Sequence, residues 1–167
     1  MKTYYLTLSQ TFPATHPRKG EPTGFRHKVT AAVNKWGDHQ LKLHTIRANY
    51  PFWAKRFEQI AAGEAVLSVR QWSGKPYRSK MIEICRLTKE DGIGIQKLYL
   101  TDEINLSGDY GIVEHTWELC GIPGDSKVSC KQLAYNDGLS YEDWAAWFEK
   151  YDKSKPLAII HFTSFRY

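Results

Sequence analysis

Four side chains able to do chemistry lie within the six residues Lys-Leu-His-Thr-Ile-Arg, at Lys42, His44, Thr45 and Arg47. A lysine with a lowered pKa can act as a general base, a threonine hydroxyl beside it as a nucleophile, and an arginine can hold an anion. The stretch has the composition of a β-strand, but apolar and polar residues mix on both of its faces. We therefore predict a strand over 41–47 that runs into a site. His44 is interpreted as a partly buried structural histidine.

A second group of candidate residues lies further along the chain, around a Gly-Pro turn. Cations there alternate with aromatic rings, and such a pattern is suited to holding phosphates and stacking an unpaired base. A solvated basic hairpin with its tryptophan packed inward is an equally good interpretation. Together with Arg47, the predicted ligand-binding residues are Arg70, Trp72, Lys75, Tyr77, Arg78 and Lys80.

Composition limits the class of protein. The 167 residues carry a net charge of +5 with a pI of about 9.0, which favours a polyanionic partner such as RNA or a nucleotide. Three scattered cysteines without a CxxC pair favour a reducing compartment. The first residues do not form a signal peptide, and no apolar run is long enough to cross a membrane. We predict a cytoplasmic protein with no membrane association, no metal site and no cofactor.

Strands and helices must place these side chains. The pattern predicts strands at 3–9, 41–47, 65–72, 80–87, 93–100 and 156–165, and helices at 24–36, from Asn49 to Gly63, at 129–135 and at 140–151. Residues 11–24 contain five proline and glycine breakers and are predicted to be a solvated loop, and 101–127 to be an irregular insertion. Strands and helices that do not alternate regularly predict an α+β fold with a mixed or barrel-like sheet, in one domain over 1–167.

The central motif, Lys42-x-x-Thr45-x-Arg47, resembles that of the ASCH domains, small barrels related to the RNA-binding PUA fold. That family has a glycine two residues before the lysine, where this chain has Gln40. Residues 63–69, 81–84 and 136–162 also resemble family segments, so the likeness covers most of the chain in short matches. An alternative register places the motif at 62–70, with alanine in place of the lysine. The resemblance implies a PUA-like mixed β-barrel with helices packed around it.

The resemblance implies two functions: binding of RNA or a nucleotide, and, as in some ASCH proteins, hydrolysis of N4-acylated cytidine. The residues that match the family's catalytic lysine, threonine and glutamate are Lys42, Thr45 and Asp137. A regular strand would place Lys42 and Thr45 on opposite faces, so a bulge or a strand end must bring them together. Each of the three also has a structural interpretation, as a strand lysine, a β-forming threonine and a turn aspartate. A third possibility is a protein-interaction module.

Overall fold

The computed structural model describes residues 1–37, 40–100, 110–115 and 124–167, with the backbone alone over 110–115 and 124–127. The smaller of its two sheets consists of β1 (Lys2–Leu8), β3 (Ala65–Trp72) and β4 (Met81–Leu87), in the order β1–β3–β4. The larger sheet is formed by β2 (His44–Arg47), β8 (Leu157–His161), β5 (Gly94–Leu100), β6 (Tyr110–His115) and β7 (Gly124–Ser129), in that order. The predicted α+β class is confirmed, and the described strands form two open sheets.

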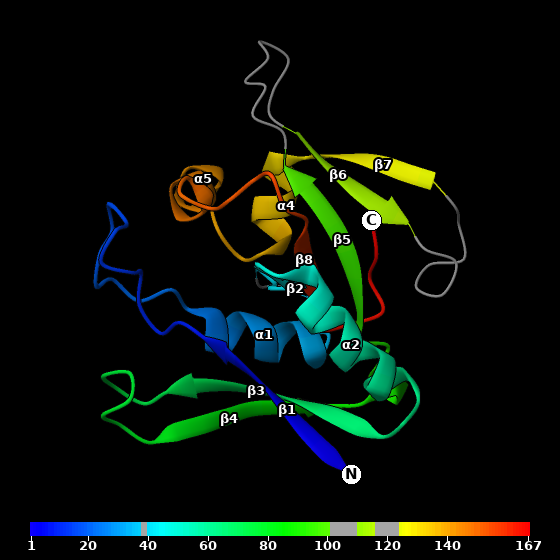
Figure 1. Ribbon diagram of the computed structural model, residues 1–167. Helices are drawn as coiled ribbons and strands as arrows, with labels where there is room; N and C mark the ends of the chain where they lie inside the picture. The colour runs from blue at the N-terminus through cyan, green and yellow to red at the C-terminus, as the bar shows by residue number, and fades with distance from the viewer. Residues whose placement is uncertain (38–39, 101–109, 116–123) are drawn as a thin grey trace.

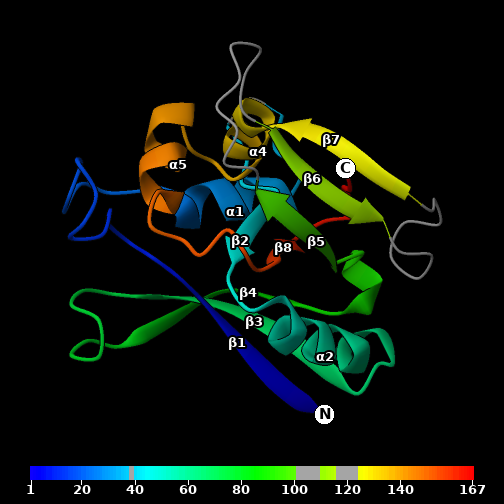
Figure 2. The same cartoon turned by 45° about the horizontal axis from the view of Figure 1, so that its top comes forward.

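Helices cover these sheets from several sides (Figure 1). They are α1 (Phe25–Val33), α2 (Tyr50–Ala61), α4 (Cys130–Asn136) and α5 (Tyr141–Phe148), with a short 3₁₀ turn, η1 (Lys89–Asp91), between β4 and β5. In both Figure 1 and Figure 2, the smaller sheet and α2 lie on one side of the molecule, and β5, β6, α4 and α5 lie on the other. β2 and β8 run between the two sides.

The apolar face of each sheet faces the middle of the molecule. Alternate residues of β1, Leu6 and Leu8, are almost fully buried, as are Leu67 and Val69 on the neighbouring strand β3. Five consecutive residues of β8 are buried because this strand lies between β2 and β5 and is covered on both faces. The site stretch therefore pairs with a strand whose five residues are all buried.

The predicted helix starts are correct. Asn49 and Ser129 cap α2 and α4 by accepting hydrogen bonds from Phe52 and Gln132, at 3.3 Å and 3.1 Å. Ser140 caps α5 in the same way. The predicted end of the first helix is wrong: α1 ends at Val33 rather than 36. Lys35 has a φ of 57°, in the left-handed region, which a continuing helix does not allow.

Residues 11–24 contain no helix or strand, as predicted, but they are not simply solvated. His16 is buried, and its Nε2 lies 3.0 Å from the carbonyl oxygen of Asp143 in α5. Arg18 forms an ion pair of 2.6 Å with the Asp143 carboxylate. This carboxylate therefore binds the loop, and not the start of its own helix as in a full capping box. Residues 11–24, expected to be a solvated loop, therefore bind α5 through His16 and Arg18.

The predicted insertion at 101–127 contains β6 and the first four residues of β7, and its remaining residues lie outside the described part of the chain. Within the described residues, no helix is both long enough and apolar enough to span a membrane.

Candidate functional site

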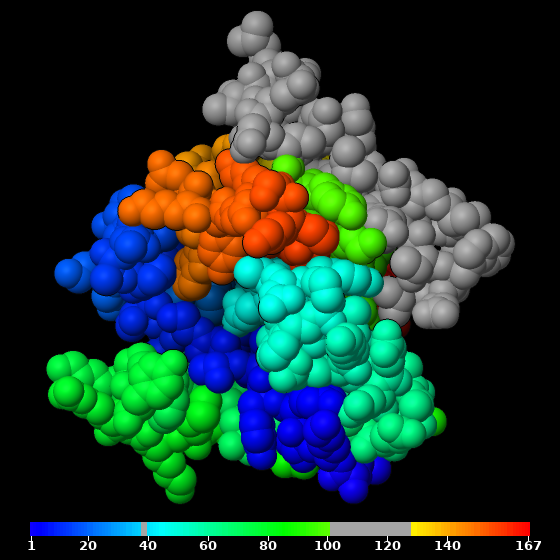
Figure 3. All heavy atoms as spheres, viewed as in Figure 1, coloured from blue at the N-terminus to red at the C-terminus, as the bar shows by residue number. Residues whose placement is uncertain are grey.

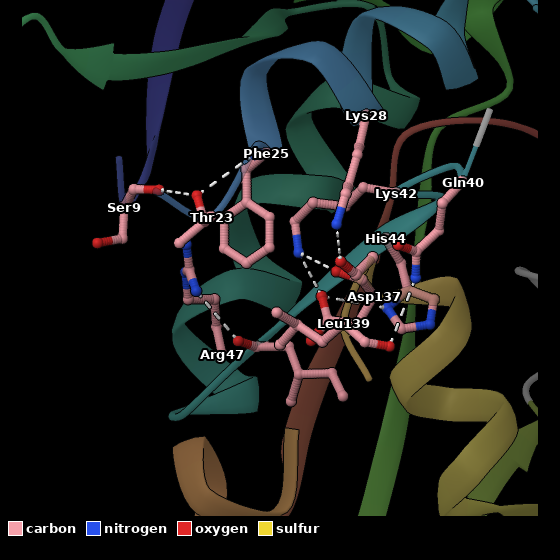
Figure 4. Close-up of polar contacts among 12 residues, drawn as sticks. Ser9, Thr23, Phe25, Lys28, Gln40, Lys42, His44, Arg47, Asp137 and Leu139 are labelled. Carbon is pink, nitrogen blue, oxygen red and sulfur yellow. Dashed lines mark hydrogen bonds and ion pairs between the residues drawn. The ribbon is translucent and has the colours of Figure 1, made fainter. Parts of the chain in front are cut away.

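The structure joins two of the three proposed catalytic residues. The Lys42 ammonium group donates hydrogen bonds to a carboxylate oxygen of Asp137 at 2.5 Å and to the Asp137 carbonyl oxygen at 2.7 Å (Figure 4). Both side chains are almost fully buried, with exposed fractions of 1% and 4%. The Lys42 nitrogen also lies 3.9 Å from the centre of the Phe25 ring. The pair is a desolvated ion pair with an aromatic ring on one side.

Lys42 reaches Asp137 because it lies before β2 and not within it. The predicted strand 41–47 begins only at His44. The backbone N–H groups of Lys42 and Leu43 bond instead to the carbonyl oxygens of Lys28 and Asn136. Alternation along a strand therefore does not govern the direction of the Lys42 side chain. The sequence predicts either a β-bulge or a strand end near Lys42, and the structure has a strand end there.

Asp137 occupies the C-terminal cap of α4. The next residue, Gly138, has a φ of 77°, and the helix closes there with backbone bonds from Gly138 and Leu139 to preceding carbonyl oxygens. A Cβ atom on Gly138 would lie 3.2 Å from the Lys42 Cβ and from a side-chain carbon of Lys28. This position thus favours glycine both for its backbone conformation and for the close approach of the two lysines.

Burial shifts the pKa of each partner in the direction that favours its neutral form. Desolvation lowers the pKa of Lys42 to about 8, although the attraction of Asp137 opposes that shift. Desolvation also raises the pKa of Asp137, against the attraction of Lys42. The pKa of the half-buried Lys28 is lowered as well, and its ammonium group donates to the Gly138 carbonyl oxygen at 2.6 Å. Burial therefore brings the pKa values of Lys42 and Asp137 closer together.

His44 adds a second polar group to the pair. Its Nδ1 lies 4.0 Å from the Asp137 carboxylate, and its Nε2 lies 2.6 Å from the Tyr167 hydroxyl oxygen. That oxygen accepts a hydrogen bond of 3.0 Å from the Asn136 amide, so we assign the hydroxyl proton to the bond with Nε2. Burial first, and then the charge of Lys42, holds the pKa of His44 well below its ordinary value. His44 is therefore a buried neutral histidine. The interpretation as a partly buried structural residue underestimated its burial.

Thr45 is not linked to the pair by a hydrogen bond among the described residues. It is buried on β2 opposite Ile160 of β8, and strand alternation places it on the other face from His44. Arg47 extends away from Asp137 (Figure 4). Its guanidinium group donates to the carbonyl oxygens of Thr7 and Ile46, at 2.8 Å and 3.2 Å. In the alternative register at 62–70, Ser68 stands in place of the threonine. Its hydroxyl donates to Glu83 within the smaller sheet.

The hairpin between β3 and β4 lies apart from β2. The two belong to different sheets, and the hairpin tip projects from the side of the molecule in both ribbon views (Figures 1 and 2). The sequence led us to expect one basic, aromatic-lined cleft between the 42–47 strand and the 70–80 hairpin, and residues of two separate sheets would have to form it. Arg70 is already engaged: its Nε donates to Ser68, and its guanidinium lies 4.2 Å from the centre of the Tyr5 ring.

Most of the other predicted ligand-binding residues are exposed at the tip of the hairpin. Tyr77 is 90% exposed, and its ring centre lies 5.3 Å from that of the half-buried Trp72. Hydrogen bonds of the Ser79 hydroxyl with Gly74 and Lys75 fix the turn. The remaining three cations are exposed and form no ion pair within the described part of the chain: Lys75, Arg78 and Lys80.

The described residues contain no group of three or more histidine, cysteine, aspartate or glutamate side chains arranged to hold a metal ion. A comparison of the chain with protein-family models, with curated proteins and with solved structures finds no match. The interpretation of function therefore rests on the chain's own geometry.

Proposed function

We propose that this protein is an ASCH-like, PUA-related nucleic-acid-binding protein that binds single-stranded RNA or a nucleotide through the β3–β4 hairpin. The observation that carries the proposal is the hairpin tip, where Lys75, Arg78 and Lys80 are exposed, form no ion pair within the described residues, and flank the exposed Tyr77 in the sequence. Cations without partners can neutralise phosphates, and an exposed ring can stack a base. The pI of about 9.0 agrees with such a partner.

The test is a titration of fluorescein-labelled single-stranded RNA against the protein, at several salt concentrations. The triple variant Lys75→Ala/Arg78→Ala/Lys80→Ala removes three phosphate-binding charges. We expect it to reduce the slope of log affinity against log salt by about 2, because each phosphate contact to a single strand contributes about 0.7. Tyr77→Ala should weaken binding without changing this slope.

The control is the triple variant Lys19→Ala/Lys131→Ala/Lys150→Ala, which removes the same charge from exposed positions elsewhere. Equal losses in the two triple variants would show that only the net charge matters, and the hairpin would then have no specific role. Recovery of one stoichiometric protein partner in place of RNA would favour the protein-interaction alternative.

A second candidate function, hydrolysis of an N4-acylated cytidine, is favoured by the buried Lys42–Asp137 pair. A lysine whose pKa is lowered to about 8 can remove a proton near neutral pH. The reaction would add water across the amide bond and release the acid and cytidine. It also requires the Thr45 hydroxyl to reach Lys42, and no hydrogen bond joins these two side chains among the described residues.

Incubation with N4-acetylcytidine, with acetate release as the readout, tests this candidate. Thr45→Val keeps the shape of a β-forming residue and leaves the ion pair in place, so the variant should fold and lose turnover. Lys42→Met should also lose turnover. If Thr45→Val releases acetate at the wild-type rate, Thr45 is not the nucleophile.

A further inference from the structure

A second basic and aromatic surface lies at the opposite end of β1 from the hairpin. Four residues of α2, at spacings of three and four, form one helical face, and they pack beside two residues of β1. Between the helix and the strand lies an open groove of about 460 Å³. Figure 3 shows α2 and β1 side by side on one face of the molecule. We name this groove the α2–β1 groove; its main residues are Lys2, Tyr4, Phe52, Lys55, Arg56 and Gln59.

Arg56 is held in place by aromatic rings. Its guanidinium carbon lies 3.3 Å from the centre of the Phe52 ring and 5.0 Å from that of Tyr4. One N–H group donates to the Phe52 carbonyl oxygen at 2.9 Å. A stacked guanidinium loses less conformational entropy when it binds a phosphate, and its other N–H groups remain available for a second, bidentate contact. Arg56 is therefore pre-organised to bind an anion.

Phe52 contributes little to the core. Its side chain is 44% exposed, whereas the next residue, Trp53, is 8% exposed and belongs to the core. A half-exposed phenylalanine at the rim of a groove offers a flat surface on which a base can stack. Packing of the core does not explain this residue, whose ring carries the Arg56 guanidinium and leaves part of its surface exposed.

The charge of the α2–β1 groove is of one sign. Lys2, Lys55 and Arg56 contribute three positive charges, and none of the lining residues is acidic. Within the described residues, none of the three forms an ion pair with a carboxylate. Lys2 lies 5.0 Å from the centre of the Tyr4 ring, so it is directed over the groove. Three cations without counter-charges among the described residues, beside the exposed Phe52 ring and the partly buried Tyr4 ring, match the phosphates and bases of a single strand.

We propose that the α2–β1 groove is a second binding site for single-stranded nucleic acid, in which Arg56 and Lys55 bind backbone phosphates and Phe52 stacks a base. This inference rests on the proposed function, since it names a further contact for the same class of ligand. β1 separates the groove from the hairpin: Lys2 pairs with Ala65 at one end, and Leu8 pairs with Gln71 beside the hairpin at the other. Seven residues of strand span roughly 23 Å, so a short oligonucleotide occupies one site and a longer one reaches both.

The experiment compares labelled single-stranded oligonucleotides of four and twelve uridines in anisotropy titrations at 50 mM salt. We expect Arg56→Ala to weaken binding of the longer one about tenfold, and Lys55→Ala and Phe52→Ala by a few-fold each. Arg56→Lys keeps the charge but loses stacking and bidentate geometry, so its affinity should fall while its salt slope stays unchanged. Lys55 is exposed, and its replacement tests the site without disturbing the fold.

Lys131→Ala, on an exposed position of α4, is the matched control for Lys55→Ala and should bind as the wild type does. Wild-type affinity in Arg56→Ala and Lys55→Ala, together with a loss in the hairpin triple variant, would overturn this inference and leave the proposed function standing. Losses in the groove variants, with none in the hairpin variant, would support the groove and overturn the hairpin proposal. A wild-type protein that binds neither oligonucleotide overturns both.

Discussion

Lysine occupies two opposite environments in this molecule. Lys42 is 1% exposed and bonded to Asp137, whereas Lys75 at the hairpin tip and Lys55 in the α2–β1 groove are exposed and have no carboxylate partner in the described part of the chain. Desolvation lowers the pKa of Lys42 to about 8. The buried Lys42 thus depends on Asp137 as its partner, whereas the exposed lysines of the hairpin and the groove are available to bind ligands.

This difference determines what a substitution reveals. A buried charge needs its partner because removal of the partner leaves an uncompensated ion, so changes near Lys42 should act mainly on stability. An exposed cation is hydrated and screened by salt, so changes at the hairpin should act mainly on binding. Four predictions, from the largest expected effect to the smallest, test this division.

Asp137→Ala should have the largest effect on stability. It leaves the Lys42 ammonium buried with only the backbone carbonyl oxygen of residue 137 as an acceptor among the described residues, and a broken buried pair costs about 3–5 kcal/mol. Urea unfolding measures the loss. The double variant Lys42→Met/Asp137→Leu removes both charges and should recover most of it. A double variant as unstable as Asp137→Ala would show that the charge is not the cause.

The pH dependence of stability should also report on Lys42. Its pKa is about 8 in the folded protein and about 10.5 when unfolded, so between these values the unfolded state binds more protons. The contribution of Lys42 to the unfolding free energy therefore rises with pH across this window, by about 1.4 kcal/mol for each unit of separation. Unfolding measured at pH 8 and pH 10 in the wild type and in Lys42→Met isolates this contribution. A difference between the two proteins that does not change with pH would contradict the lowered pKa.

Tyr167→Phe should cost about 1–3 kcal/mol, because it leaves the buried Asn136 amide and the His44 Nε2 without their shared hydroxyl partner. Thermal unfolding provides the measurement. Tyr135→Phe is a matched control, since Tyr135 is 61% exposed and its replacement should change stability little. Equal effects of the two changes would mean that the Tyr167 hydroxyl bonds add no stability.

Lys75→Ala and Arg78→Ala should have the smallest effect on stability, within about 0.5 kcal/mol, because their side chains are exposed and form no ion pair among the described residues. The same proteins should bind RNA more weakly. A large loss of stability in either variant would show that the hairpin cations support the fold, and the division between the two regions would fail.

Local signals were sufficient to predict most of the fold. Asn49, Ser129 and Ser140 cap the helices that the sequence predicts to start there. The strand predicted over 65–72 has the same bounds in the structure. These features depend on backbone groups a few residues away, so a short window contains the necessary information. The end of α1 was missed because the residue with the left-handed conformation, directly after the Asn34 cap, is a lysine and not the usual glycine.

The site was less predictable because its contacts are long-range. The Lys42–Asp137 pairing came from a family resemblance, since 95 positions separate the two residues and no spacing rule connects them. The role of His44 depends on Tyr167, at the other end of the chain, and was not foreseen. The α2–β1 groove was also missed: α2 was recognised, but only the folded chain places β1 beside its Arg56 face.

The strand pairing of β2 has a consequence for how the protein assembles. Among the described strands, β2 pairs only with β8, and the adjoining Lys42 contacts Asp137, so both interactions need residues that are made much later than β2 itself. Closing so long a loop is entropically costly and slows folding. Lys42 therefore stays hydrated until residue 137 and β8 join the fold, and we expect burial of its charge to be a late event in folding.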